Sequence, residues 1–157
     1  MSEFILCMGI SGSGKTFYSK KWAEADPEHR VRLNYDDIRN MLGKYWVPNR
    51  EWLVKKIFDT GLHQAMNAGL DIIIDNMSNL NPKHYKYYED LVHSHNQSSE
   101  KSSYIINKIV FNTPYEECIR RDSEREIPIG EDVIKGQYDK YREYIYDRPN
   151  SELDATA

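Results

Sequence analysis

One stretch of sequence decides the fold: Gly9-Ile10-Ser11-Gly12-Ser13-Gly14-Lys15-Thr16. It matches the pattern G-x-x-x-x-G-K-[ST], whose glycine-rich backbone wraps around phosphate groups. An apolar segment, Phe4–Met8, comes directly before it, and a helical pattern over residues 16–25 follows. Strand, glycine-rich turn and helix in this order predict an α/β protein that binds a nucleotide. The alternative is a tight strand-to-helix turn with no ligand.

The chemistry of such a loop explains its residue types. Glycines allow the backbone N–H groups to point at the phosphates, and the helix that follows adds its positive N-terminal end. The lysine reaches the β- and γ-phosphates, and the hydroxyl after it can bind Mg²⁺. The loop alone leaves an ATPase, a GTPase and a kinase open, and because the guanine-reading pattern N-K-x-D is absent we do not expect a GTPase. The residues expected to contact the nucleotide phosphates and Mg²⁺ are Gly9, Ser11, Gly12, Ser13, Gly14, Lys15 and Thr16.

The rest of the chain alternates between strand and helix patterns. Three further apolar segments read as strands, at residues 30–34, 70–75 and 104–111. Helical periodicity or capping signals predict helices at residues 36–42, 51–68, 82–95, 114–125 and 133–145. Thr113-Pro114-Tyr115-Glu116 reads as a capping box. Alternation of this kind predicts an α/β fold with a mainly parallel sheet of four to five strands.

Length and composition fit one soluble domain. The chain has 157 residues, of which 39% are hydrophobic and 29% charged. We expect a single domain over residues 1–148, followed by a polar tail over 149–157. Cys7 and Cys118 lie far apart and read as reduced, buried thiols. No apolar run reaches membrane length, so we expect no membrane association and a cytoplasmic protein, in the host cytoplasm if a phage encodes it.

The net charge of −4 weighs against a broad nucleic-acid-coating surface. It leaves room for a small site that is basic only locally. The oligomeric state is not predicted by the composition or by any motif.

A second candidate site follows the second predicted strand, in Asn34-Tyr35-Asp36-Asp37-Ile38-Arg39. The carboxyl ends of parallel strands share one edge with the phosphate loop. An acid there can accept the proton of an attacking hydroxyl. Arg39 lies one helical turn after Asp36, so the pair suits an acceptor with a hydroxyl and a phosphate. The alternative is an N-capping Asp-Asp pair beside a solvated arginine.

Arginines near the end of the predicted helix 114–125 form a third candidate. Arg121 and Arg125 are four residues apart and project from one helix face. Ile127-Pro128-Ile129 follows them and could form a lid that brings both guanidinium groups over the triphosphate. The alternative is a solvated charge network with Glu124.

Two weaker signals remain open. Asp75 ends the Ile-rich third strand, where an acid could hold Mg²⁺ directly or through water, or could simply cap a turn. The tyrosines at 85, 87 and 88 could stack nucleobases, although helical spacing of 85 and 88 favours packing in the core.

Together these motifs resemble the kinase domain of the phage polynucleotide 5′-hydroxyl kinase family, within the P-loop kinase superfamily. The family order is the phosphate loop, N-x-D-D-x-x-R, a strand with D-x-N-L-x-P, and R-x-x-x-R before a proline. The chain matches it over residues 3–146 with Asn34–Arg39, Asp75, Asn79-Leu80-Asn81-Pro82, and Arg121, Arg125 and Pro128. One residue more than the family pattern lies between Asp75 and Asn79.

This resemblance implies a P-loop kinase three-layer sandwich with a helical lid. It implies transfer of the ATP γ-phosphate to the 5′-OH end of DNA or RNA, or of a short nucleotide. By the same resemblance Asp36 is the general base, Arg39 holds the acceptor phosphate, and Arg121 and Arg125 contact the donor phosphates. The phosphatase motif D-x-D-G-T is absent, so only the kinase activity is expected.

Two other functions stay open on the sequence. The same loop, acid and arginines would serve a kinase for a small hydroxyl compound, such as a nucleoside, nucleotide or sugar. A non-catalytic ATP-binding switch would need only the loop.

Overall fold

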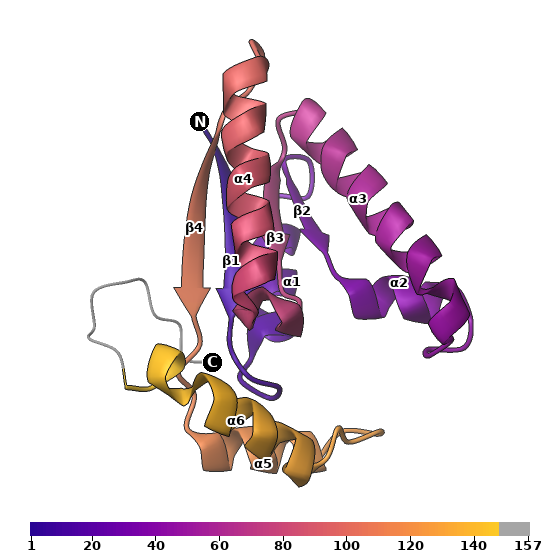
Figure 1. Ribbon diagram of the computed structural model, residues 1–157, viewed down its shortest axis with the longest axis vertical. Coiled ribbons are helices and arrows are strands. Elements are labelled where there is room, and N and C mark those ends of the chain that lie inside the picture. The colour runs from indigo at the N-terminus through magenta and orange to yellow at the C-terminus, as the bar shows by residue number, and fades with distance from the viewer. Residues whose placement is uncertain (148–157) are drawn as a thin grey trace.

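The protein, described here as a computed structural model over residues 1–147, is built on one sheet of four parallel strands (Figure 1). The strands lie in the order β2-β3-β1-β4. Their bounds are β1 Ser2–Met8, β2 Arg30–Leu33, β3 Asp71–Ile74 and β4 Tyr104–Val110. The four predicted strands are therefore confirmed, with ends that differ by one or two residues. The predicted polar tail, 149–157, lies outside the described residues.

Side chains of the central strand β1 alternate between the two faces of the sheet, as a strand requires. Phe4, Leu6 and Met8 enter the larger core, which α3 (Glu51–Asn67) and α4 (Pro82–Ser98) cover. On the other face, Ile5 and Cys7 pack against α1 (Lys15–Glu24). Helices on both faces of the sheet give the three layers that the sequence predicted.

The remaining helices lie at the carboxyl edge of the sheet, where each strand ends (Figure 1). The first, α2 (Tyr35–Met41), leads away from the sheet into a loop and a 3-10 turn, η1 (Pro48–Arg50). A second 3-10 turn, η2 (Met77–Leu80), follows β3. The helices α5 (Tyr115–Ser123) and α6 (Glu131–Ile145) pack side by side across the end of β4.

Local capping explains where several of these helices begin. The side chain of Asn34 accepts a hydrogen bond from the N–H of Asp37, and that of Asn81 accepts one from Lys83. Asparagine therefore caps α2, and the alternative of an N-capping Asp36-Asp37 pair is wrong. The predicted capping box at Thr113 is also wrong, because its hydroxyl donates to the carbonyl of Ser13 instead, at 2.9 Å.

Within residues 1–147, every helix is too short or too polar to span a membrane. Cys7 and Cys118 are both free and buried. Tyr88 is buried in the larger core, which confirms the packing interpretation for that tyrosine.

Candidate functional site

The phosphate loop connects β1 to α1 and is packed so closely that only glycine fits at two of its positions. A Cβ atom on Gly9 would lie 2.5 Å from Ser13 Oγ and 2.9 Å from Phe111 Cβ. At Gly12, φ is +81° and a Cβ would lie 2.5 Å from the Cys118 carbonyl oxygen. The loop is therefore held between β4 and α5, with its backbone free of side chains where phosphates would approach.

Lys15 lies at the first turn of α1 and is almost fully buried, with 8% of its surface exposed. Its Nζ donates to the carbonyl oxygens of Gly9 and Ile10, at 2.6 and 2.9 Å. Burial lowers the pKa of Lys15 to about 8, against an ordinary value of 10.5. The ammonium group of Lys15 therefore lies inside the loop, beside the backbone that is expected to bind the phosphates.

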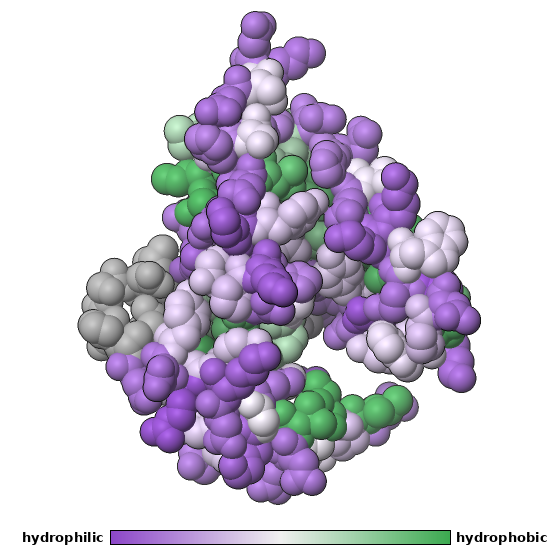
Figure 2. Space-filling view, in the orientation of Figure 1, coloured by the Kyte–Doolittle hydropathy of each residue, from purple (hydrophilic) through white to green (hydrophobic). Residues whose placement is uncertain are grey.

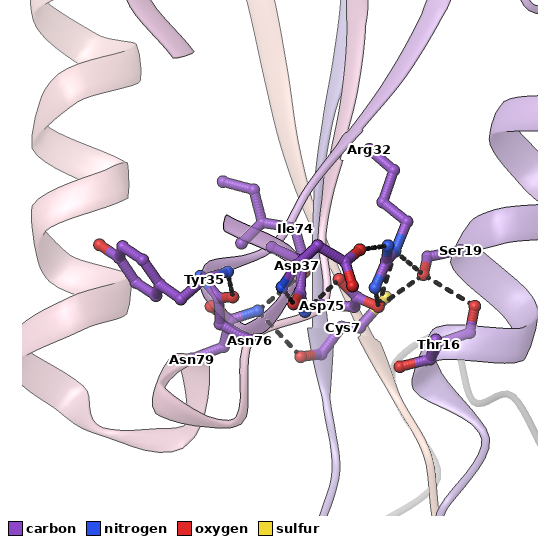
Figure 3. A network of polar contacts seen from close by, with 11 residues as sticks. Cys7, Thr16, Ser19, Arg32, Tyr35, Asp37, Ile74, Asp75, Asn76 and Asn79 are labelled. Atoms are coloured by element: carbon purple, nitrogen blue, oxygen red, sulfur yellow. Dashed lines mark hydrogen bonds and ion pairs between the residues drawn. The ribbon is translucent and has the colours of Figure 1, made fainter. Parts of the chain in front are cut away.

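A network of polar contacts joins α1 to the ends of β2 and β3, as Figure 3 shows. Asp75 is buried, and its Oδ2 accepts from Ser19 Oγ at 2.8 Å and from Arg32 Nε and Nη2 at 2.9 and 2.8 Å. Ser19 Oγ also lies 3.2 Å from the carbonyl oxygen of Thr16. Arg32 forms a further ion pair with Asp37. The predicted acid is therefore compensated by a partly buried arginine.

Thr16 and the loop backbone fit a nucleoside triphosphate with Mg²⁺, because the loop is a cradle that a Cβ would fill and α1 begins at it. The hydroxyl of Thr16 is the side-chain ligand that would hold the cation, which supplies charge neutralisation at the phosphates. Direct ligation by Asp75 would compete with its Arg32 contacts. Of the two predicted modes, the geometry therefore favours a contact between Asp75 and Mg²⁺ through a water molecule.

Asparagines fix the carboxyl ends of the strands around this network. Asn34 Nδ2 donates to Asp75 Oδ1 at 3.0 Å while its oxygen caps α2. Asn76 Oδ1 accepts from the N–H of Tyr35 at 2.8 Å. Asn79 Nδ2 donates to the carbonyl oxygens of Cys7 and Ile74, at 3.0 and 2.8 Å. These contacts place the start of α2 next to the end of β3.

The predicted acceptor pair, Asp36 and Arg39, is brought together on α2. Arg39 Nη1 donates to Asp36 Oδ1 at 2.8 Å, and its Nη2 donates to Glu51 Oε1 at 2.6 Å. The hydroxyl of Tyr45 also donates to Asp36 Oδ1, at 2.7 Å. The sequence analysis missed Glu51 and Tyr45, because both lie outside the N-x-D-D-x-x-R pattern and join it only through folding.

The predicted arginine pair lies beside the phosphate loop. Arg121 Nη1 donates to the Gly12 carbonyl oxygen at 3.4 Å, and its Nε donates to Glu117 at 3.0 Å. The positive charge of Arg125 contributes to lowering the pKa of Lys15, so it acts within electrostatic range of the loop. Arg125 also lies 3.6 Å from Asp122.

The solvated charge network on this helix centres on Arg120. Arg120 pairs with Glu117 at 2.6 Å and with Glu124 at 2.7 Å, on the exposed side of α5. Hydrogen bonds from Arg120 and Arg121 hold the pKa of Glu117 at about 2. Arg121 therefore contacts the loop while it shares Glu117 with Arg120, which also pairs with Glu124.

Two residues that the sequence analysis missed also shape this side of the site. Gln137, on α6, accepts a hydrogen bond from the N–H of Ser11 at 2.9 Å. Asp122 is buried and accepts from the N–H groups of Ile129 and Gly130, both at 2.9 Å. Asp122 thus fixes the turn that joins α5 to α6. A helical periodicity gives no signal for either contact.

Apart from Arg125, the predicted residues fall into two groups within the described part of the chain. The phosphate loop, Arg121 and, through Ser19, Asp75 form one connected set. Asp36 and Arg39 form the other, tied to the first through the start of α2 at Asn34. The two groups lie at the same edge of the sheet, as parallel topology requires.

The model of a family described as an AAA domain matches residues 4–147. The chain belongs to this AAA domain family. The match begins within β1, extends past the end of α6 and includes all of the candidate site residues. No curated protein sequence matches the chain closely enough to count as a relative.

Solved structures show that this AAA domain has a P-loop kinase fold. A chain in the structure of the Pnkp1/Rnl/Hen1 RNA repair complex superposes with a TM-score of 0.67 at 20% identity. The match covers 96% of this chain and 47% of that chain. The shikimate kinase of Acinetobacter baumannii, in complex with shikimate, gives a TM-score of 0.54 at 14% identity, over 100% of this chain and 84% of that one.

A sugar kinase from a Janibacter species gives a TM-score of 0.53 at 16% identity, over 100% of this chain and 85% of that one. The AAA domain therefore spans about half the length of the RNA repair chain and most of the length of the small-molecule kinases. At these identities the likeness shows the fold alone.

Proposed function

We propose that this AAA domain is a polynucleotide 5′-hydroxyl kinase, which transfers the γ-phosphate of ATP to the 5′-OH end of DNA or RNA. The observation that carries the proposal is the Asp36–Arg39 pair, held together at 2.8 Å where α2 leaves the sheet. A carboxylate beside a guanidinium provides a base for a hydroxyl and a cation for an adjacent phosphate. A sugar or shikimate acceptor lacks that neighbouring phosphate.

The hydrogen bonds of Asp36 leave one of its oxygens available for catalysis. Arg39 and Tyr45 both donate to Oδ1, and within residues 1–147 Oδ2 accepts no hydrogen bond. The side chain is 59% exposed, so an acceptor hydroxyl can reach it. In the proposed step Oδ2 accepts the hydroxyl proton, the 5′ oxygen forms a bond to the γ-phosphorus, and the bond from that phosphorus to the β-γ bridging oxygen breaks to release ADP.

Arg39 keeps donors for the acceptor phosphate although it is already paired. A guanidinium has five N–H donors. In the described chain Nε and Nη2 each donate to Glu51, and Nη1 donates to Asp36. One N–H on each terminal nitrogen is left, which is the fork that binds a phosphate by two hydrogen bonds.

On the donor side, Lys15, Arg121 and Arg125 would balance the charge of the triphosphate. Phosphoryl transfer depends mainly on positioning and on electrostatic stabilisation of the transferred group. The contact of Arg121 with the Gly12 carbonyl places one guanidinium at the loop. Thr16 would hold the Mg²⁺ that accompanies ATP, with Asp75 acting through water.

The test of the proposal is a transfer assay with γ-labelled ATP and a panel of acceptors. The panel contains a 5′-OH DNA oligonucleotide, a 5′-OH RNA oligonucleotide, a 3′-phosphorylated nucleoside and the plain nucleoside. We expect label on the oligonucleotides and the 3′-phosphorylated nucleoside and little on the plain nucleoside. Equal or better labelling of the plain nucleoside would contradict the proposal.

A substitution at the base sharpens this test. Asp36→Asn should lower kcat for 5′-OH oligonucleotides by about 10²–10⁴-fold, with the KM for ATP unchanged, because proton transfer is lost while the loop is intact. The matched control is Asp37→Asn, which removes the adjacent carboxylate that pairs with Arg32. If Asp37→Asn causes the larger loss of kcat, the base is Asp37 instead.

A kinase for a small hydroxyl compound is the second candidate. The specific observation in its favour is size, because the small-molecule kinases match this chain over 84–85% of their own length. The same assay separates the two functions when shikimate and simple sugars are added to the panel. Label on one of these, without label on any 5′-OH end, would favour the second candidate.

A further inference from the structure

The segment after α2 exposes large aromatic side chains next to the proposed acceptor pair. Tyr45 is 46% exposed and Trp46 is 54% exposed. Rings of this size are usually more buried, because each removes a large apolar area from water when it packs. Figure 2 shows the molecule hollowed between the α2–α3 side and the α5–α6 segment.

These rings gather around Arg39. Its guanidinium carbon lies 5.8 Å from the ring centroids of Tyr45 and Trp46, and at the same distance from that of Tyr35. These are cation–π distances, so the aromatic surface and the proposed phosphate-binding cation are adjacent parts of one surface. A ligand with alternating anionic and flat aromatic groups matches this arrangement.

The aromatic loop is anchored to the candidate base. The hydroxyl of Tyr45 donates a hydrogen bond to Asp36 Oδ1 at 2.7 Å. Burial and the neighbouring carboxylate raise the pKa of Tyr45, so this donor keeps its proton at neutral pH. Trp46, as the next residue, is therefore held at a defined distance from the reacting end of an acceptor.

We propose that Trp46, with Tyr45 beside it, stacks the nucleobase of the second nucleotide of the acceptor strand. This inference rests on the proposed function and extends it. The carboxylate of Asp36 lies 2.8 Å from Arg39, whose guanidinium carbon lies 5.8 Å from the ring centroid of Trp46. That order matches the 5′-hydroxyl, the first internal phosphate and the next base of a single strand. Stacking on a π-face tolerates any base, so the preferred acceptor is a single-stranded end of two or more nucleotides.

The inference is tested with two dinucleotide acceptors that differ only in the second base. One is an ordinary 5′-OH dinucleotide, and the other carries an abasic sugar at its second position. For the ordinary dinucleotide, Trp46→Ala should raise KM by about 5- to 150-fold, with kcat and the KM for ATP unchanged. For the abasic acceptor, wild type and Trp46→Ala should have the same KM. Trp46→Phe should restore most of the lost affinity.

The matched control is Trp52→Ala. Trp52 carries an indole that is 69% exposed, and within residues 1–147 it makes no cation–π contact with Arg39 and no hydrogen bond with Asp36. Its substitution should leave both KM values unchanged. A change in KM for Trp52→Ala equal to that for Trp46→Ala would overturn the inference.

Two further outcomes separate the inference from the proposed function. If wild type labels 5′-OH ends but Trp46→Ala has an unchanged KM, or an equal rise for both acceptors, the stacking role is wrong and the kinase function stands. If wild type labels no 5′-OH end, the function and the inference both fail. The aromatic surface would then fit a protein partner better than a nucleic acid.

Discussion

The two sides of the candidate site are built in opposite ways. On the donor side, the phosphate loop is buried between β4 and α5, and Lys15 is only 8% exposed. On the acceptor side, Asp36 has 59% of its side chain exposed, and the residues around it hold one another through ion pairs and hydrogen bonds. One side is therefore made of backbone fixed by packing, and the other of side chains fixed by charge.

This difference has a physical reason in what each side would bind. A triphosphate is the same in every cycle, and fixed N–H groups recognise it best when the backbone cannot move. Acceptors differ between kinases of one fold, and specificity residues concentrate on exposed segments that tolerate change. The three predictions that follow test whether the donor side depends on packing and the acceptor side on charge.

The largest effect that we expect is on the pH dependence of stability through Lys15. Its pKa falls from 10.5 to about 8 on folding, so between these values the unfolded chain binds more protons than the folded one. The free energy of unfolding of wild type should therefore rise by about 3 kcal/mol, relative to Lys15→Met, as pH rises from 8 to 10.5. Below pH 8 Lys15 is protonated in both the folded and the unfolded chain, so this gain in stability is absent. Urea unfolding at both pH values measures it.

Arg39→Gln is the matched control on the acceptor side. Glu51 and Asp36 raise the pKa of Arg39, so this residue stays charged across the same range. The stability difference between wild type and Arg39→Gln should not change between pH 8 and 10.5. Parallel pH curves for wild type and Lys15→Met would show that the buried ammonium carries no such cost.

A smaller effect is expected from alanine at two glycines with positive φ. At Gly12 the new Cβ meets the Cys118 carbonyl at 2.5 Å, whereas at Gly43, where φ is +110°, nothing lies within 4 Å. Both substitutions strain the backbone, but only Gly12→Ala adds an overlap. Gly12→Ala should lower the free energy of unfolding by about 2 kcal/mol more than Gly43→Ala. Equal losses in urea unfolding would mean that α5 yields to the loop.

The smallest effect is expected from Arg39→Gln on the acceptor. The KM for a 3′-phosphorylated nucleoside should rise by about tenfold, because a charged hydrogen-bonded pair with the phosphate is lost. The KM for ATP should not change. Glu51→Gln is the control, since it breaks the 2.6 Å ion pair that joins α2 to α3 but keeps the arginine. If both variants raise KM equally, Arg39 acts by holding α2 in place.

Much of the donor side could be predicted from the sequence. Few of the residues that hold the acceptor pair in place could be predicted from it. The loop pattern, the strand before it and the Asp36–Arg39 spacing are local, and the structure places them as expected. Arg32, Glu51, Tyr45 and Gln137 gave no signal in the sequence. Each acts through a partner 5 to 126 residues away, and no local periodicity encodes such a pair.

The reading of Asp75 shows the same limit. Its position at the end of an Ile-rich strand left a magnesium ligand and a turn cap open, and the structure shows this acid buried at the carboxyl edge of the sheet. Only the folded chain shows that Arg32 and Ser19 occupy one of its oxygens and Asn34 the other. A carboxylate buried without a partner would be costly, and its partner Arg32 lies 43 residues away in sequence, on the neighbouring strand β2.

The sequence by itself determined the α/β class, the phosphate loop and the spacing of the acceptor pair. These follow from glycine's backbone freedom and from side-chain periods of two and 3.6 residues, which act over a few neighbouring positions. The tertiary structure alone decided the strand order β2-β3-β1-β4, the Arg32–Asp75 ion pair and the aromatic surface around Arg39. These depend on which distant segments pack together, and packing is a property of the whole core.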